Sequence, residues 1–210
     1  MTKTNKIAAF IFLFFLTIGL FGFFTSYNAT MKQLSHYNLF LTFGLLTLSF
    51  KNELVKFTKA FGFIFLLGYS VELIGANSGY IFGDYSYSNN LGISLFNVPI
   101  IIGINWATLS FGSWNLCKKI TSNIFLNILI ASLLMVTFDF CMEPTAIELG
   151  YWKWDNGTIP FYNYFSWFII SIPAIFICSR FDTKTSGISK IIFISQLIFF
   201  IILSTKKLWY

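Results

Sequence analysis

Three acidic side chains in long apolar stretches are the residues best suited to chemistry in this sequence. Glu72 occurs within Gly-Tyr-Ser-Val-Glu-Leu-Ile-Gly, and Asp139 and Glu143 occur within Phe-Asp-Phe-Cys-Met-Glu-Pro. The i, i+4 spacing of Asp139 and Glu143 places both carboxyls on one face of a helix. Two carboxyls that close in a poorly hydrated setting tend to share a proton. The pattern therefore predicts a site that can transfer protons.

Each acid also has a simpler interpretation. An acid inside a membrane helix costs roughly 3 kcal/mol on insertion scales, so it is expected to face a polar partner, the bundle interior or water. In this simpler interpretation, Glu72 and Asp139 have no chemical role and fix helix register through hydrogen bonds to Ser, Asn or Tyr. Glu143 lies close to a polar loop, where a solvated carboxylate is the alternative. Pro144 follows it, and the missing N–H of proline predicts that the helix ends there or gives way to the loop.

Two long loops, 77–97 and 143–160, concentrate Gly, Asn, Tyr and Trp. Their aromatic side chains form either an interfacial belt or a site lined with π-faces, which stabilise positive charge. The residues concerned are Tyr80, Tyr85, Tyr87, Tyr151, Trp152 and Trp154. The sequence has no nucleotide-binding loop, no H-E-x-x-H zinc motif and no G-x-S-x-G nucleophile elbow. We therefore expect no cofactor and no metal.

The elements that position these residues are apolar helices. Of the 210 residues, 56% are hydrophobic and 10% are charged, whereas soluble proteins carry about 25% charged residues. A helix needs about 20 mostly apolar residues to cross a bilayer. Seven such runs occur, at 7–25, 34–50, 57–76, 98–117, 123–142, 161–179 and 188–204, although six or eight crossings also fit the pattern. We predict an all-α, polytopic transmembrane bundle of about seven helices, a single domain over residues 1–210.

The basic residues predict how this bundle is oriented. With seven helices, the N-terminus and the loops on its side hold ten Lys and Arg residues, and the opposite side holds four. The ten are Lys3, Lys6, Lys51, Lys56, Lys59, Lys118, Lys119, Arg180, Lys184 and Lys190, and the four are Lys32, Lys153, Lys206 and Lys207. Because cytoplasmic loops carry an excess of Lys and Arg, we expect the N-terminus in the cytoplasm, and a bacterial cytoplasmic membrane as the location.

Polar and aromatic motifs follow one another in a characteristic order over about residues 68–168. In the first half they are Glu72-Leu-Ile-Gly75, Gly79-Tyr-Ile-Phe-Gly83-Asp-Tyr85-Ser-Tyr87, Leu91-Gly92, Val98-Pro99 and Trp106. In the second half they are Asp139-Phe-Cys-Met-Glu143-Pro144, Gly150-Tyr-Trp152-Lys-Trp154, Ile159-Pro160 and Asn163-Tyr-Phe-Ser-Trp167. This order resembles the membrane carotenoid hydratase family, the carotenoid 1,2-hydratase and bisanhydrobacterioruberin hydratase-like carotenoid biosynthesis proteins. Asn97, Glu143 and Ser166 differ from the residues that we expect in this family at the corresponding positions. These differences leave room for a different reaction at the carotenoid end group.

The resemblance implies a cofactor-independent hydro-lyase of carotenoid biosynthesis. It implies hydration of the terminal C1=C2 double bond of an acyclic carotenoid to a tertiary alcohol, which needs a proton donor, a stabilised carbocation and one positioned water. We expect Asp139 or Glu72 to donate the proton and Glu143 or Asp84 to orient the water. The residues expected to bind the substrate are Tyr80, Tyr85, Tyr87, Trp152, Trp154, Asn163 and Trp167.

The implied partners are a lipophilic carotenoid, water as co-substrate and membrane lipid, and no nucleic acid. The resemblance is also compatible with association with other carotenoid enzymes.

Three other functions fit the same residues. A carotenoid end-group cyclase also begins by protonating an alkene, but its pocket excludes water. A proton-coupled transporter uses Glu72 and Asp139 as relay groups. A carotenoid-binding subunit needs none of the acids.

Overall fold

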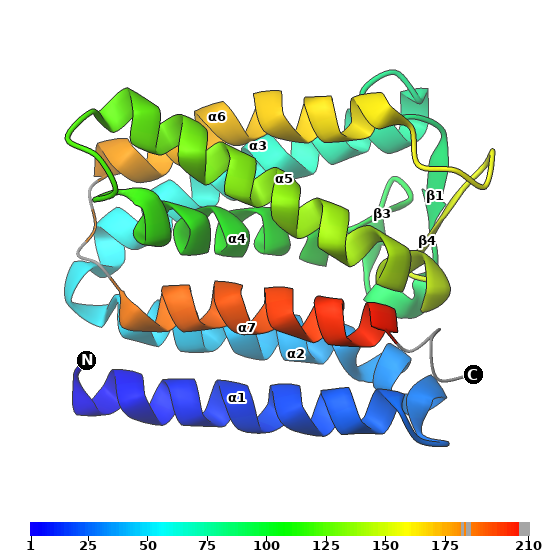
Figure 1. The fold of residues 1–210 in the computed structure, drawn as a ribbon, viewed down its shortest axis with the longest axis horizontal. Helices are drawn as coiled ribbons and strands as arrows, with labels where there is room; N and C mark the ends of the chain where they lie inside the picture. Colours follow the sequence, from blue (N-terminus) through cyan, green and yellow to red (C-terminus); the bar gives the residue numbers. More distant parts are fainter. Residues whose placement is uncertain (182, 184–185, 206–210) are drawn as a thin grey trace.

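The computed structural model describes residues 1–181, 183 and 186–205. Over these residues, seven α-helices run side by side in one bundle (Figure 1). They are α1 (Lys3–Phe23), α2 (Asn28–Ser49), α3 (Leu54–Ser78), α4 (Ile101–Cys117), α5 (Ile124–Glu148), α6 (Phe161–Phe181) and α7 (Gly187–Ser204). The predicted all-α bundle is confirmed. Lys184, Lys206 and Lys207 of the orientation count lie outside the described residues.

Most of these helices are membrane spans by length and composition. Five described segments are long and apolar enough to cross a bilayer, namely Lys3–Phe23, Lys51–Ser78, Ile124–Glu148, Phe161–Phe181 and Gly187–Ser204. The helix α4 has 17 residues and falls just short in length. The helix α2 extends over 22 residues, further than predicted, and its first half carries polar side chains. The molecule is a membrane protein.

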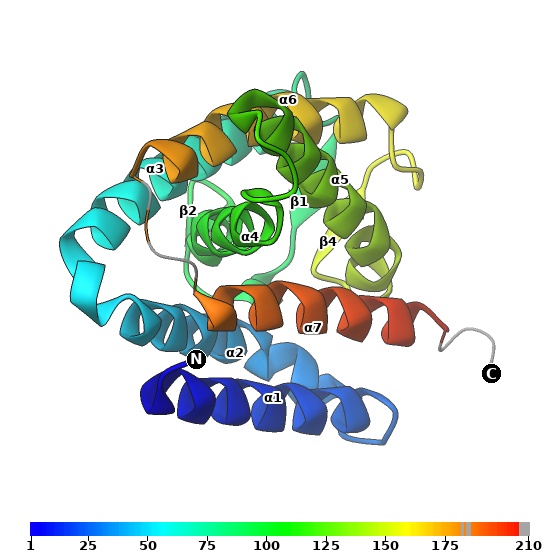
Figure 2. The same ribbon diagram turned by 60° about the vertical axis from the view of Figure 1, so that its left-hand side comes forward.

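The helix α4 lies at the centre of the bundle. Figure 2 shows it nearly end-on, enclosed by α3, α5, α6, α7 and α2, with α1 outside α2 and α7. All residues of α4 are buried except Asn105 and Leu116. Small residues allow neighbouring helices to approach it closely, since a Cβ added at Gly112 would lie 2.7 Å from the Cβ of Phe193 on α7. A helix covered on all sides needs little lipid-facing length, which fits its shortness.

The prediction that the fifth helix ends at Pro144 is wrong. Pro144 lies inside α5, which continues to Glu148. Proline removes one helical hydrogen bond, but the turn after it is held in place by other contacts. The N–H of Tyr151 donates to the carbonyl of Ala146 at 3.0 Å, and Ala146 is completely buried. Packing and end-of-helix hydrogen bonds therefore outweigh the local effect of proline.

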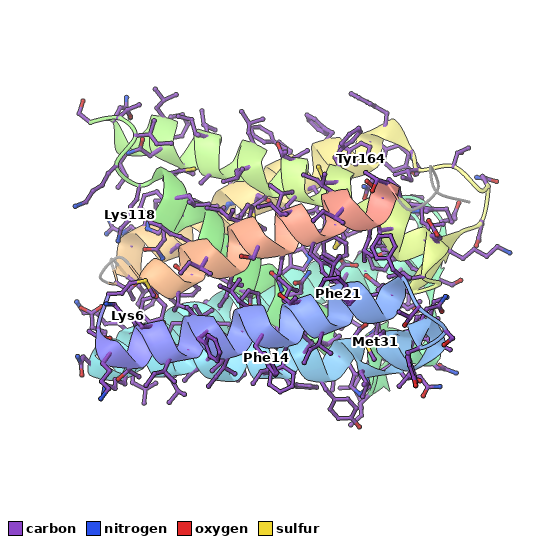
Figure 3. The ribbon with its side chains drawn as sticks, turned by 60° about the horizontal axis from the view of Figure 1, so that its bottom comes forward. Lys6, Phe14, Phe21, Met31, Lys118 and Tyr164 are labelled. Atoms are coloured by element: carbon purple, nitrogen blue, oxygen red, sulfur yellow. The ribbon has the colours of Figure 1, made fainter. Side chains whose placement is uncertain are left out.

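The bundle has two chemically different ends. Figure 3 shows Lys6 and Lys118 at one end, and Met31 and Tyr164 toward the other. Phe14 projects from α1 between the ends and Phe21 from its last turn, near Met31, with 52% and 68% of their surfaces exposed. The aromatic loops that follow α3 and α5 lie at the end away from Lys6 and Lys118 (Figure 1). The candidate acids therefore lie toward the end away from these lysines.

Candidate active site

A cavity of about 500 Å³ joins the three predicted acids. Glu72 on α3 and both Asp139 and Glu143 on α5 line it, and each is at most 3% exposed. Apolar side chains of α1, α2 and α7 form much of the remaining wall. Six of the predicted substrate-binding residues also line it, namely Tyr85, Tyr87, Trp152, Trp154, Asn163 and Trp167. The volume falls within the range of small-molecule sites.

Three donors hold the carboxyl group of Glu72. The hydroxyls of Tyr85 and Tyr87 donate to its Oε2 at 2.6 and 2.7 Å. The indole N–H of Trp106 donates to its Oε1 at 3.1 Å. Both oxygens of a deeply placed carboxyl therefore have partners, as a buried polar group requires.

A two-stranded ribbon supplies the donors for two of the acids. Strands β1 (Tyr85–Tyr87) and β4 (Trp152–Trp154) pair antiparallel, with Tyr85 opposite Trp154 and Tyr87 opposite Trp152. The N–H of Ser88 donates to the backbone carbonyl of Tyr151 at 2.9 Å, and the N–H of Asp155 donates to the backbone carbonyl of Asp84 at 3.0 Å. Antiparallel ladders alternate hydrogen-bonded and non-hydrogen-bonded pairs, so the aromatic pairs occupy the sites where side chains lie closer.

Successive side chains of each strand point to opposite faces, and the aromatic side chains point toward the cavity. Ser86 and Lys153, between the aromatic residues, are exposed. From β4, the indole N–H groups of Trp152 and Trp154 donate to Oε2 of Glu143 at 3.0 and 3.2 Å. One short ribbon therefore orients an acid of α3 through tyrosines and an acid of α5 through tryptophans.

Gly79 makes this placement possible. It ends α3 with φ of 72°, in the left-handed region that favours glycine. The chain can therefore reverse directly after the helix that carries Glu72. The strand β1 then brings Tyr85 and Tyr87 back to that carboxyl.

Asp139 has a simpler environment. Among the described residues, its hydrogen bond comes from Asn163 on α6, whose Nδ2 donates to Oδ2 at 3.1 Å. Its neighbours Phe138 and Met142 on α5 are buried and apolar, and they also line the cavity. Asp139 is therefore the least hydrogen-bonded of the three acids.

The aromatic rings give the site a wall of π-faces. Trp106 and Trp167 stack with ring centroids 4.1 Å apart and planes 16° from parallel. Tyr85 and Trp154 lie 5.0 Å apart, and Tyr87 and Trp152 lie 5.9 Å apart. Such faces attract positive charge at close range.

The tyrosines of β1 remain donors at neutral pH. Burial and then the neighbouring Glu72 carboxyl raise the pKa of Tyr85 well above its usual value of 10.0. The same two causes raise the pKa of Tyr87. Both phenols therefore keep the protons that they donate to Glu72.

Two predicted site residues lie elsewhere. Asp84 is exposed and does not line the cavity. Its carboxyl lies instead against Gly79, where an added Cβ would meet Oδ1. Tyr80 is 90% exposed and is also absent from the cavity wall. Tyr80 and Asp84 lie in the turn between the end of α3 and the start of β1. They are therefore near Glu72 in the sequence but do not contact it in the cavity.

Trp106 is the main residue that sequence reasoning did not assign to the site. It belongs to the ordered motifs, but nothing local to it indicates that its indole reaches Glu72. A Cβ added at Gly68 on α3 would lie 2.5 Å from Cγ of Trp106. The absence of a side chain at Gly68 therefore leaves the space that Trp106 occupies.

The donor set offers little to a metal ion. Among the described residues, no group of three or more His, Cys, Asp or Glu side chains is arranged to hold one. The carboxyls instead face amide, indole and phenol groups.

The fold and the site define a membrane helix bundle with carboxyl groups buried in an apolar cavity. The chain belongs to the carotenoid biosynthesis protein family, whose model matches residues 10–208. It is also similar to bisanhydrobacterioruberin hydratase of Haloarcula japonica, with 24% identity over 120 residues. That match covers 52% of this chain and 40% of the relative's length. No solved structure matches the chain. Membership of the carotenoid biosynthesis protein family gives the protein a role in carotenoid biosynthesis.

Proposed function

We propose that the protein hydrates the terminal C1=C2 double bond of an acyclic carotenoid and forms a tertiary alcohol. The observation that carries the proposal is the cavity in which Glu72, Asp139 and Glu143 meet under apolar and aromatic walls. Family membership and the name of the hydratase relative support the substrate class and the reaction type. Alkene hydration needs an acid, a base and a stabilised cation, and the cavity offers groups for all three.

Asp139 is the proton donor in this scheme. A carboxylic acid in an apolar site can carry a proton and act as a general acid. Asp139 accepts one hydrogen bond from the described residues, whereas Glu72 accepts three. It therefore has more freedom to direct its proton at an alkene. Transfer of that proton to C2 uses the π-electrons of the double bond and leaves a tertiary cation at C1.

Glu143 then directs the water. Its Oε2 is held by Trp152 and Trp154, which fix the side chain. Water adds through its oxygen to C1, and the proton that it loses passes to Glu143. Return of a proton from Glu143 to Asp139, one helical turn away on α5, restores the starting state. The sum is addition of one water molecule to the double bond.

Glu72 and the aromatic rings stabilise the intermediate. Hydrogen bonds at both oxygens keep Glu72 in place, so it provides a fixed negative end of the cavity. The rings of Tyr87 and Trp152 from the ribbon and of Trp106 from α4 line the same space. Groups fixed in position before the reaction stabilise developing charge without reorganising.

The apolar part of the cavity suits the polyene chain. Phe15 and Ile18 on α1 line it and are 48% and 45% exposed on the lipid-facing side of the bundle. A carotenoid dissolves in the bilayer, so lateral access between helices is the direct route. Burial of its chain would contribute affinity of about 25 cal/mol per Å² of apolar surface. The reacting end alone would meet polar groups.

Expression in cells that accumulate lycopene tests the reaction. Extracted pigments would be separated by chromatography and identified by mass spectrometry. We expect products heavier than lycopene by one or two water molecules. An isomer of unchanged mass with an altered spectrum would indicate cyclisation instead. Unaltered lycopene, with the protein demonstrated in the membrane, would rule out hydration of this substrate.

A further inference from the structure

Gln196 on α7 is a buried amide that the scheme above does not use. It is 5% exposed and lines the cavity that holds the three acids. Its Oε1 has no hydrogen-bond partner among the described residues. A buried acceptor without a donor destabilises the protein. The position therefore calls for a ligand with an O–H or N–H group.

The face of α7 that carries Gln196 packs against the part of α5 that carries the acids. Phe193 and Phe200, three residues before and four after Gln196, share this face. Their ring centroids lie 5.2 and 5.8 Å from that of Phe138, the residue before Asp139. Gln196 is therefore at the level of the reacting end of the cavity.

A second amide also has an unpaired carbonyl oxygen at the cavity. Asn38 on α2 also lines the cavity, and its Oδ1 has no partner among the described residues. Elsewhere this part of the wall consists largely of Phe and Leu side chains. A water molecule in a protein cavity typically makes two to four hydrogen bonds. Each of these unpaired carbonyl oxygens can accept a hydrogen bond from such a molecule.

We infer that Gln196 holds the water that attacks the carbocation, and that Asn38 accepts a hydrogen bond from a second water molecule in the same cavity. This inference rests on the proposed hydration. Water that donates one O–H to Gln196 and the other to Glu143 has its lone pairs free for C1. Gln196 is therefore a positioning residue, and it decides the fate of the cation.

The cation can react in two ways, and the two products differ in mass. Addition of water at C1, with loss of one water proton to Glu143, gives the tertiary alcohol. Loss of a proton from C2 or from a methyl group on C1 to a carboxylate returns an alkene of unchanged mass. In D₂O, an alkene returned in this way can carry deuterium. Removal of the water acceptor should favour this second fate without preventing protonation.

The experiment compares the wild type with Gln196→Met in membranes supplied with lycopene in D₂O. Met has a similar length and no strong acceptor. We expect the ratio of hydrated product to deuterated, unhydrated carotenoid to fall about five- to tenfold, as loss of one hydrogen bond implies. Gln196→Glu restores an acceptor oxygen and should recover part of the ratio. Asn38→Leu should lower it to a smaller extent.

Ser132→Ala is the matched control. Its hydroxyl is completely buried and unpaired among the described residues, like the Gln196 carbonyl, but it does not line the cavity. The ratio should remain that of the wild type. An unchanged ratio in Gln196→Met, or equal loss of hydration and deuterium uptake, would overturn the inference while leaving hydration intact as a function. Absence of hydration in the wild type would overturn the proposed function itself.

Discussion

Single residues in the cavity differ in how firmly they are held. Glu72 accepts hydrogen bonds at both oxygens, and Glu143 accepts two at one oxygen. Asp139 accepts one from Asn163 among the described residues. A proton donor must move its proton toward substrate, whereas a group that stabilises charge works best when fixed. This difference supports the proposed assignment of the donor role to Asp139 rather than to Glu72, a choice that the sequence left open.

Replacement of Asp139 by Asn tests the assignment. The amide keeps the shape of the side chain but has no acidic proton. We expect product formation to fall by about 10²-fold or more, the usual contribution of a general acid. Pigment analysis at equal membrane protein levels measures the effect. Glu148→Gln changes an exposed acid on the same helix and should leave product formation unchanged. Full activity of Asp139→Asn would transfer the donor role to Glu72.

Helices and strands position these residues through close contacts that individual motifs do not reveal. Seven helices and the inward position of the acids follow from hydrophobic runs and from the cost of exposing a carboxyl to lipid. The pairing of β1 with β4 does not follow, because a three-residue strand gives almost no signal and its partner is 65 residues or more away. Asp84 illustrates the limit, since nearness in sequence to Glu72 did not predict its exposed position.

The contact between α3 and α4 can be tested at Gly68. A Cβ at this position would lie 2.5 Å from Cγ of Trp106, which donates to Glu72 and stacks on Trp167. Gly68→Ala should displace the indole, destabilise the protein by about 1–3 kcal/mol and lower product formation. Thermal unfolding in detergent and pigment analysis measure the two effects. Gly62→Ala, on the same helix with open space around it, should change neither. Equal behaviour of the two variants would contradict the packing described for Trp106.

The ribbon of β1 and β4 can be tested without touching any aromatic residue. Ser86 is exposed and pairs with Lys153, at a hydrogen-bonded position by the alternation of the ladder. Ser86→Pro removes a backbone donor and should separate the tyrosines from the tryptophans. We expect a loss of product formation with normal membrane insertion. Ser86→Thr keeps the donor and favours strands, so it should retain activity. An active Ser86→Pro variant would show that the acids keep their geometry without the ribbon.

The whole molecule combines a lipid-facing exterior with a polar site near one end of the bundle. The ribbon joins the loop after α3 to the loop after α5, and α6 adds Asn163 and Trp167. The site therefore depends on segments from both halves of the chain, although α1, α2 and α7 complete the cavity with walls that are largely apolar. This division suits a substrate whose long apolar part stays near lipid while one end reacts. It also makes the side of the membrane on which the acids lie important for the supply of water and protons.

Cysteine labelling can establish that side. Lys119 and Asn156 are exposed in loops at the two ends of the bundle. In a background without Cys117, Cys141 and Cys178, each position would be changed to Cys and treated with a membrane-impermeant maleimide in spheroplasts. Since basic loops remain in the cytoplasm, Asn156→Cys should react in intact spheroplasts and Lys119→Cys only after permeabilisation. The acids would then lie toward the outer face and take up water from it. The reverse labelling would contradict the orientation and place the site toward the cytoplasm, where the proton supply follows cytoplasmic pH.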